Sequence, residues 1–207
     1  MAVPAAQLPT RRDDRPTEDR VVVLQGASWA DWRRLVEVRS DAPTPRLSFV
    51  DGALELMSPS RDHERIASIL RRLVEEWAER QGLEVATLGS WTLEHAPRAG
   101  VEPDECFSFH GAGRTPSEQR PDVAIEVVWT SGRISKLEAY RTLGVPEVWV
   151  WRNDTLRVFV LRAHGYDETG GSEVLPGIDL QRVAEALGEP TVTAAARRFW
   201  QRGPATR

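Results

Sequence analysis

Lysine is almost absent from the sequence. Of its 27 positively charged side chains, 26 are arginines and only Lys136 is a lysine. Arginine therefore meets any general need for positive charge. A single ammonium in this background favours a position that a guanidinium cannot fill, because lysine offers a compact, flexible charge with a tunable pKa. The alternative is a lysine that arose by chance on a solvated helix face.

Cysteine and long apolar runs are also scarce. The single Cys106 excludes an intramolecular disulfide and a cysteine-rich zinc site, and it fits a reducing compartment. No apolar run approaches the roughly 20 residues of a membrane-spanning helix. Residues 1–20 lack the apolar region of a signal peptide. We therefore expect a cytoplasmic protein without a membrane partner.

A strong excess of basic charge is missing as well. The net charge of the 207-residue chain is −4 and its pI is about 5.7, which counts mildly against nucleic-acid binding. It does not exclude a nuclease, because a phosphate-binding groove needs only local positive charge. We expect a flexible N-terminal tail over residues 1–20, one domain over 21–190, and a C-terminal helix and tail over 191–207.

The N-terminal half of the chain predicts helices around a β-hairpin. A short helix capped by Ser28 covers 29–36, and a hairpin over 47–57 turns at Asp51-Gly52. Apolar residues at helical spacing predict a long helix over 66–77, which Gly82 ends. Further strands are expected over 83–88, 91–93 and 106–109.

The C-terminal half predicts a βαβ unit. A nearly continuous apolar strand over 123–129 is followed by a helix over 134–143 and a strand over 147–151. Such a unit implies a parallel strand pair with a right-handed crossover. Either Ser135, at capping-box spacing from Glu138, or Ser131 could cap the helix. With a strand over 156–161 and helices over 180–187 and 193–200, the fold class is α/β, a mixed central sheet flanked by helices.

Glu126 is the second unusual residue, because it interrupts the most apolar strand. An unpaired carboxylate there would cost several kcal/mol of desolvation, so Glu126 is exposed at the sheet end, paired with an arginine, or bound to a cation. Lys136 begins the following helix, and helical side chains lean toward the N-terminus. Its ammonium should point back at the carboxyl end of the Glu126 strand. Aspartate, glutamate and lysine around strand ends are typical of a metal-dependent phosphodiesterase.

The aspartate could be Asp104 or Asp122, since each follows a proline. Asp122 and Glu126 lie four residues apart on one strand, which separates them by about 13 Å. Two ligands of one Mg²⁺ cannot lie that far apart. We therefore favour Asp104, which comes from another segment, and assign Asp122 to strand entry, with an auxiliary role at the site as the alternative.

Two further residues are candidates. Glu55 alternates with apolar neighbours in the hairpin strand, so it is either a solvent-facing strand residue or a third carboxylate of the site. His63 begins the long helix, where an imidazole is either simply exposed or in contact with substrate or a metal-bound water.

Seven short segments carry a resemblance to a known family. They are Leu54-Glu55-Leu56-Met57-Ser58-Pro59, His63-Glu64, Leu88-Gly89-Ser90, Glu102-Pro103-Asp104-Glu105-Cys106, Pro121-Asp122 to Glu126-Val127, Lys136-Leu137-Glu138-Ala139-Tyr140 and Gly144-Val145-Pro146-Glu147-Val148-Trp149. Each segment alone is weak, but their succession is specific. Over residues 24–187 the chain resembles the Uma-type restriction endonucleases, small bacterial proteins of the PD-(D/E)XK phosphodiesterase superfamily.

The resemblance implies a restriction-endonuclease-like core and a set of site residues. Asp104 corresponds to the metal-binding aspartate, Glu126 to the glutamate of the second half-motif, and Lys136 to the catalytic lysine. The lysine has moved onto the next helix, because Val128 stands two residues after Glu126. Glu55 matches an acidic residue before the first core helix and is a further candidate metal ligand.

The implied function is a Mg²⁺-dependent endonuclease, with Mn²⁺ as a substitute, that hydrolyses phosphodiester bonds of nucleic acid, with DNA as the expected substrate. Relatives often carry an acidic residue at the position of Val128, so the number of metal ions stays open. DNA against RNA preference, sequence specificity, and a monomer or homodimer also stay open. The alternatives are a non-catalytic nucleic-acid-binding or protein-interaction domain with this fold, and a hydrolase of smaller phosphodiesters.

Overall fold

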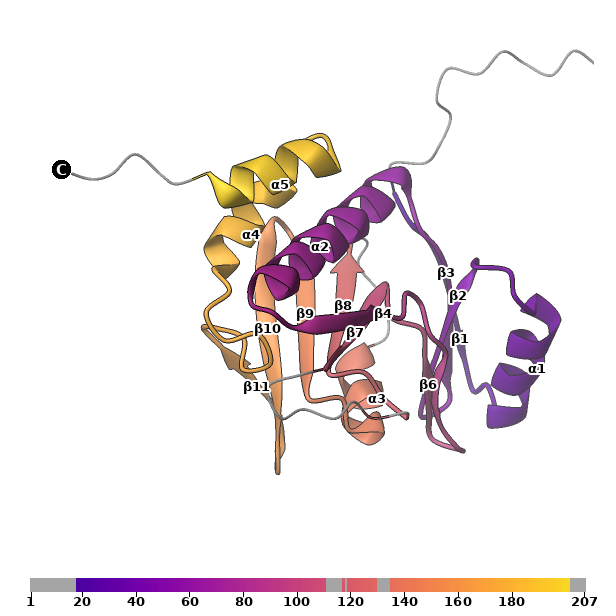
Figure 1. The fold of residues 1–207 in the computed structure, drawn as a ribbon. Helices are drawn as coiled ribbons and strands as arrows, with labels where there is room; N and C mark the ends of the chain where they lie inside the picture. Colours follow the sequence, from indigo (N-terminus) through magenta and orange to yellow (C-terminus); the bar gives the residue numbers. More distant parts are fainter. Residues whose placement is uncertain (1–17, 111–116, 118, 130–134, 202–207) are drawn as a thin grey trace, which may run out of the picture.

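The computed structural model describes residues 18–110, 117, 119–129 and 135–201. Within these residues, eleven strands form two sheets that lie side by side, and five helices pack against them (Figure 1). The strand order is β1-β3-β2-β6-β5 in the first sheet and β11-β10-β9-β8-β7-β4 in the second. No helix in the described part of the chain is long and apolar enough to cross a membrane.

The first sheet is antiparallel and is covered on one face by a short helix. Its strands are β1 (Arg20–Gln25), β2 (Arg46–Val50), β3 (Ala53–Ser58), β5 (Leu93–His95) and β6 (Ala99–Val101), and the helix is α1 (Trp29–Arg39). Ser28 caps α1 in a capping box with Asp31. The helix packs closely, since a Cβ added to Gly100 would lie 2.4 Å from the Trp32 ring. The β2–β3 turn uses positive φ angles at Asp51 (44°) and Gly52 (92°), as a tight hairpin turn requires.

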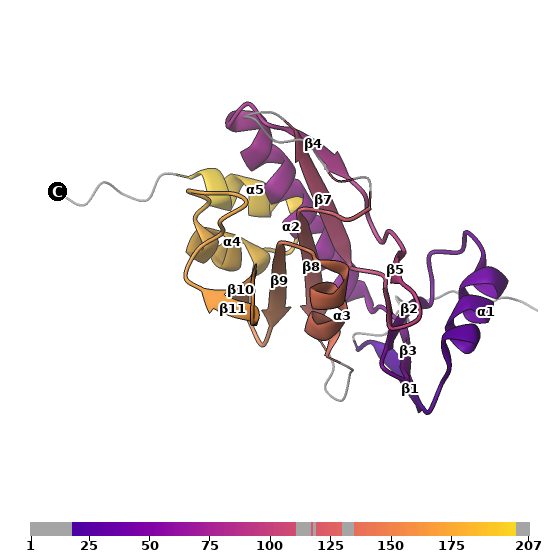
Figure 2. The ribbon, with the colours of Figure 1, turned by 90° about the horizontal axis from the view of Figure 1, so that it is seen from below.

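The second sheet is mixed and is covered on both faces. Its strands are β4 (Glu84–Thr87), β7 (Glu105–His110), β8 (Val123–Val128), β9 (Glu147–Arg152), β10 (Thr155–Arg162) and β11 (Gly165–Thr169). Among these described strands only the β8–β9 pair is parallel, and α3 (Lys136–Leu143) lies between the two in the sequence. The helices α2 (Arg61–Arg80), α4 (Leu180–Leu187) and α5 (Val192–Trp200) lie on one face and α3 lies on the other (Figures 1 and 2).

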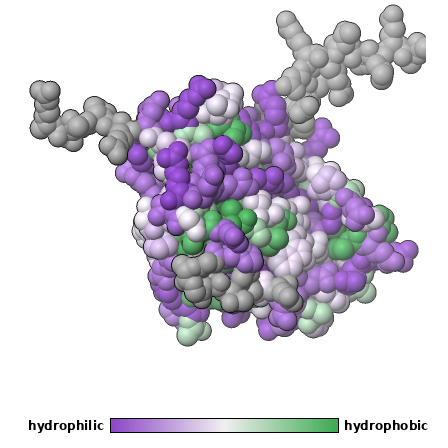
Figure 3. All heavy atoms as spheres, viewed as in Figure 1, coloured by the Kyte–Doolittle hydropathy of each residue, from purple (hydrophilic) through white to green (hydrophobic). Residues whose placement is uncertain are grey.

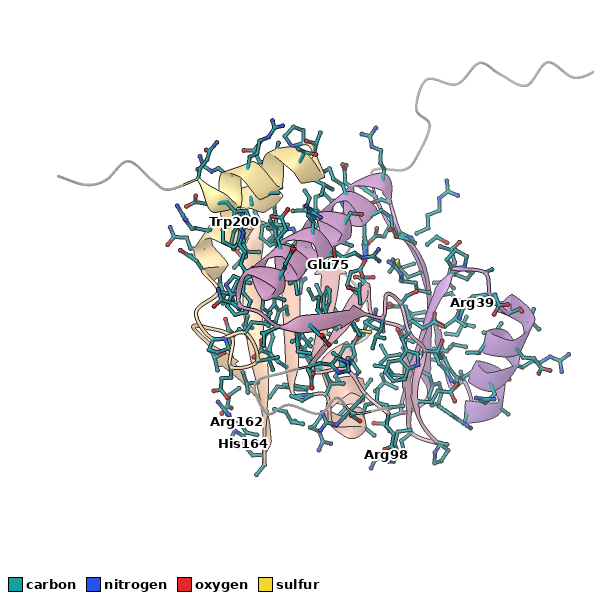
Figure 4. All side chains as sticks on the ribbon, in the orientation of Figure 1. Arg39, Glu75, Arg98, Arg162, His164 and Trp200 are labelled. Atoms are coloured by element: carbon teal, nitrogen blue, oxygen red, sulfur yellow. The ribbon has the colours of Figure 1, made fainter. Side chains whose placement is uncertain are left out.

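The main core lies between the second sheet and the α2, α4 and α5 layer. The buried stripe of α2 packs against strand residues that include Phe107 and Ile125. Trp200, labelled in Figure 4, connects α5 to α2. Its Nε1 donates to Glu76 at 2.6 Å, and Arg80 lies 3.7 Å above its ring. The Trp149 and Trp151 side chains belong to the same core and are 0% and 3% exposed. They are therefore structural and do not form a stacking surface.

Most elements that the sequence predicts are present, and several details differ. The strand expected over 91–93 is found as β5, and β1, β6 and β11 were not expected, because short or amphipathic edge strands carry a weak signal. β1 begins at Arg20 and Asp19 is buried, so the expected tail extends too far; residues 1–17 lie outside the described residues. Ser135 precedes α3 but makes no capping hydrogen bond through its side chain, and Ser131 is not among the described residues.

Candidate active site

The candidate site lies where the two sheets meet. The chain leaves β6 of the first sheet and enters β7 of the second through Glu102, Pro103 and Asp104. The Asp104 amide donates to the Ile125 carbonyl at 3.1 Å, so Asp104 lies beside β8 just before β7 begins. This crossing brings Asp104 to the carboxyl end of β8, the end at which α/β sheets carry their sites.

Asp104 is buried, and its carboxylate contacts polar groups from β2, α2 and β8. Its Oδ1 accepts from Arg46 Nη1 of β2 at 2.7 Å and lies 3.0 Å from His63 Nε2 of α2. The two nitrogens are 3.2 Å apart, because both approach the same oxygen. The other oxygen, Oδ2, accepts from the amide of Val127 in β8 at 2.6 Å. Asp104 therefore fastens the first sheet and α2 to the strand that carries Glu126.

These contacts fix the charges around Asp104. Burial raises the pKa of Asp104, but His63, Arg46 and Lys136 outweigh burial and hold the pKa well below its usual range. Burial lowers the pKa of His63, but hydrogen bonds and attraction to Asp104 and Asp19 outweigh it and raise the pKa to about 9. At neutral pH Asp104 is thus a carboxylate and His63 an imidazolium, whose Nδ1 lies 3.0 Å from Asp19 Oδ2.

Glu126 and Lys136 form a buried ion pair. Lys136 Nζ donates to Glu126 Oε2 at 2.7 Å, and the Tyr140 hydroxyl donates to Oε1 of the same carboxylate. Lys136 begins α3, where the helix dipole disfavours a cation. Glu126 offsets that cost, so the ammonium is placed for the carboxylate and not for the helix. Tyr140 stays a donor, because burial and the charge of Glu126 raise its pKa well above the usual range.

The structure therefore brings Asp104, Glu126 and Lys136 into one cluster. Asp104 bonds the amide of Val127, the neighbour of Glu126, and Lys136 lies close enough to lower the pKa of Asp104. The alternative of a lysine that arose by chance on a solvated helix face is wrong, since Lys136 is only 8% exposed. An ion pair between Glu126 and an arginine was one alternative for that carboxylate; among the described residues Glu126 pairs with Lys136 at 2.7 Å.

Glu55 is buried on the site side of the first sheet. It pairs with Ser48 of β2, and Ser48 also pairs with Val101 of β6. Directly opposed residues share a face, so Glu55 faces the same way as Val101, which belongs to the same buried cluster as Tyr140 of α3. Arg46, two residues before Ser48, points to that face and reaches Asp104. The solvent-facing alternative for Glu55 is wrong, because its exposure is 1%.

His63 and Asp122 have different surroundings. His63 is fully buried between Asp19 and Asp104, so the alternative prediction of an exposed imidazole is wrong. Asp122 lies at the entry to β8, where its carboxylate accepts from the Phe109 amide at 2.8 Å and its own amide donates to Phe107. These bonds join β7 to β8. Among the described residues, no hydrogen bond connects Asp122 with Asp104, Glu126 or Lys136.

The carboxylates in the cluster fit a hard cation. The described residues contain no group of three or more His, Cys, Asp and Glu side chains placed to hold a metal, so a dedicated protein cage of the zinc type is absent there. Mg²⁺ does not require one, since it binds through one or two carboxylates and completes its shell with water and substrate phosphate. Asp104 and Glu126 carry carboxylate oxygens, the type of ligand that such a cation takes.

Sequence reasoning missed three residues around the site: Tyr140 and Arg46 contact the cluster, and Asp19 contacts His63. Tyr140 lies four residues after Lys136, so the helical period alone could have placed it on the same face. Arg46 and Asp19 carried no such signal, because their contacts depend on how the first sheet packs against α2. Arg46 also donates to Glu64 at 2.9 Å, so one guanidinium joins two carboxylates.

Comparison with known structures defines the class of fold. The chain is similar to the crystal structure of a "putative nuclease belonging to DUF820" from Anabaena variabilis ATCC 29413, with a TM-score of 0.51 and 10% sequence identity. The match covers 83% of this chain and 98% of the other. The chain therefore has a restriction-endonuclease-like α/β fold. No curated protein matches it significantly.

The family follows from the sequence comparison. Residues 29–194 match the model of the Uma2 family, described as "Putative restriction endonuclease". Because this match spans most of the chain, the protein belongs to the Uma2 family, and the resemblance carried by the seven segments is confirmed.

Proposed function

We propose that the protein is a Mg²⁺-dependent endonuclease that hydrolyses phosphodiester bonds of DNA, and that Mn²⁺ can replace Mg²⁺. The observation that carries this proposal is the meeting of Asp104, Glu126 and Lys136 at the carboxyl end of β8, with Lys136 Nζ 2.7 Å from Glu126 Oε2. Two carboxylates and an ammonium in one buried cluster supply metal ligands and a hydrogen-bond donor for a developing negative charge.

Each residue of the cluster has a task in this proposal. Asp104 and Glu126 hold the cation, with Glu55 as a further ligand from the first sheet. The bound ion acidifies a water and neutralises charge on the phosphate. Lys136 orients the attacking water or donates to the phosphate oxygen as negative charge develops on it. Tyr140 fixes Glu126, while Arg46 and His63 fix Asp104.

A second candidate, a non-catalytic domain with the same fold, is favoured by two observations. Asp104 already accepts from Arg46, His63 and the Val127 amide, which compete with a metal for its lone pairs. Val128 also stands where the family resemblance leads us to expect an acidic residue. Against this candidate, a purely structural carboxylate does not require the chain's single lysine at a helix N-terminus.

A cleavage assay separates the two candidates. We expect the wild-type protein to cut supercoiled plasmid or single-stranded DNA with Mg²⁺ or Mn²⁺ and to lose all cleavage in EDTA. Glu126→Gln should lose the activity, because an amide is a poorer metal ligand. The matched control is Glu138→Gln, which changes a partly exposed α3 carboxylate that pairs with Arg141. Absence of metal-dependent cleavage on every substrate would favour the non-catalytic domain.

A further inference from the structure

A cavity at the edge of the second sheet is not explained by the candidate site. It has a volume of about 530 Å³ and lies against β4, β7 and the loop that follows β4, with Ala86, Leu88, Trp91 and Ser108 among its lining residues. Its size is in the range of small-molecule pockets. On the face viewed in Figure 3, hydrophobic residues gather over β4, which forms one wall.

One buried polar group in this cavity has no partner. Ser108 is 4% exposed, and its Oγ makes no hydrogen bond within the described part of the chain. A buried hydroxyl without a partner costs about 1–3 kcal/mol. The oxygen itself is buried in the cavity wall, so a ligand with a polar edge would satisfy the hydroxyl once the Ser108 side chain turns toward the cavity.

The loop that carries Trp91 is fixed to β7. The Leu88 amide donates to the Cys106 carbonyl at 2.9 Å, and Cys106 Sγ donates to the Gly89 carbonyl at 3.3 Å. Leu88 remains 38% exposed beside the cavity. The apolar and aromatic walls are therefore held in place without a ligand, so binding would cost little ordering of the loop.

An exposed arginine connects the cavity with the candidate site. Ser108 lies four residues along the chain from Asp104, which corresponds to about 13 Å in an extended strand. Arg71 of α2 pairs with Glu105, the neighbour of Asp104, at 2.6 Å, and its side chain is 46% exposed. Its Nη2 also lies 3.9 Å from where a Cβ on Gly89 would be. Arg71 thus lies near both the loop that lines the cavity and the residue next to Asp104.

We propose that the cavity receives one unpaired nucleobase of a nucleic-acid strand whose backbone runs past Arg71 to the Asp104 cluster. A base is planar, with apolar faces for Ala86, Leu88 and Trp91 and a polar edge for the Ser108 hydroxyl. Stacking of a base on an aromatic side chain contributes about 1–3 kcal/mol. The inference rests on the proposed function for the identity of the ligand, and it adds that the preferred substrate contains single-stranded nucleotides.

Binding of single-stranded octamers in EDTA tests the proposal without cleavage. Wild-type protein should bind DNA or RNA octamers about tenfold or more tightly than an octamer without bases, which keeps only the backbone. Trp91→Leu should lose this preference while its affinity for the base-free octamer stays unchanged. Trp91→Phe, which keeps a ring, should bind within about threefold of wild type. Comparison of the DNA and RNA octamers shows which sugar is accepted.

Ser108→Ala gives a second readout that a structural role would not produce. Removing the unpartnered hydroxyl should leave the melting temperature unchanged or raise it, while the affinity for base-containing octamers falls. Equal binding of intact and base-free octamers by wild type, or an intact preference in Trp91→Leu, would overturn the proposal. Plasmid cleavage is scored separately: base-dependent binding without cleavage contradicts only the proposed hydrolysis, and cleavage without base-dependent binding contradicts only the cavity.

Discussion

Replacing Lys136 with arginine should lower metal-dependent cleavage by about 100-fold or more while changing the melting temperature by only a few degrees. The positive charge beside Glu126 is kept, so the ion pair that compensates this buried carboxylate survives. The guanidinium, however, is wider, planar and effectively never deprotonated. In a site where Lys136 is 8% exposed and 2.7 Å from Glu126, it would occupy space needed by water, metal or phosphate.

The reciprocal exchange on the same helix is the control. Arg141→Lys alters an exposed arginine of α3 that pairs with Glu138, and cleavage should remain within about twofold of wild type. Initial rates on plasmid with Mg²⁺ and a thermal melt of each variant provide the comparison. Cleavage by Lys136→Arg at the wild-type rate would mean that a guanidinium serves equally well, and Lys136 would lose its catalytic role.

Replacing Asp104 with asparagine should abolish cleavage and also destabilise the protein. Its carboxylate compensates Arg46 and the His63 imidazolium, with contacts of 2.7 and 3.0 Å. Removing one partner of a buried charge pair costs about 3–5 kcal/mol, which corresponds to a melting temperature lower by about 10 °C. Loss of one carboxylate ligand should weaken Mg²⁺ binding by about 100-fold. Calorimetric titration with Mg²⁺ and thermal melts measure the two effects.

Glu147→Gln separates the loss of stability from the loss of activity. Glu147 is fully buried at the start of β9, beside Val123 and therefore at the opposite end of β8 from Glu126. It accepts from Trp149, Ser172 and two backbone amides, so its amide variant should also lower the melting temperature. Its cleavage rate and Mg²⁺ affinity should remain near wild type below the melting transition. Equal losses of activity in both variants would trace the effect of Asp104→Asn to folding alone.

The parts of the site that could be predicted from the sequence depend on local geometry. A carboxylate inside the apolar β8 strand and a lysine at the start of the next helix are joined by a short connection. The lean of helical side chains toward the N-terminus therefore fixed the Glu126–Lys136 contact in advance. The distance along one strand also favoured Asp104 over Asp122 as the partner of Glu126. In the structure, Asp122 instead joins β7 to β8.

The remaining parts depend on long-range packing that no local pattern encodes. Arg46 lies 58 positions and Asp19 lies 44 positions in sequence from the residues they contact. Their contacts exist only because the first sheet docks against α2 at the Asp104 crossing. The burial of His63 follows from the same docking, which is why the sequence left an exposed imidazole open. Short edge strands such as β6, three residues long, carry too few positions for a period to be recognised.

The most direct test of the central claim is the anomalous difference map of a crystal soaked in Mn²⁺. We expect a peak within about 2.2 Å of one oxygen of Asp104 and one of Glu126, accompanied by movement of Arg46 or Lys136 away from those oxygens. A map with no peak between the two carboxylates, in which Arg46 and His63 still occupy Asp104 and Lys136 still occupies Glu126, would contradict a shared metal site and with it the proposed hydrolysis.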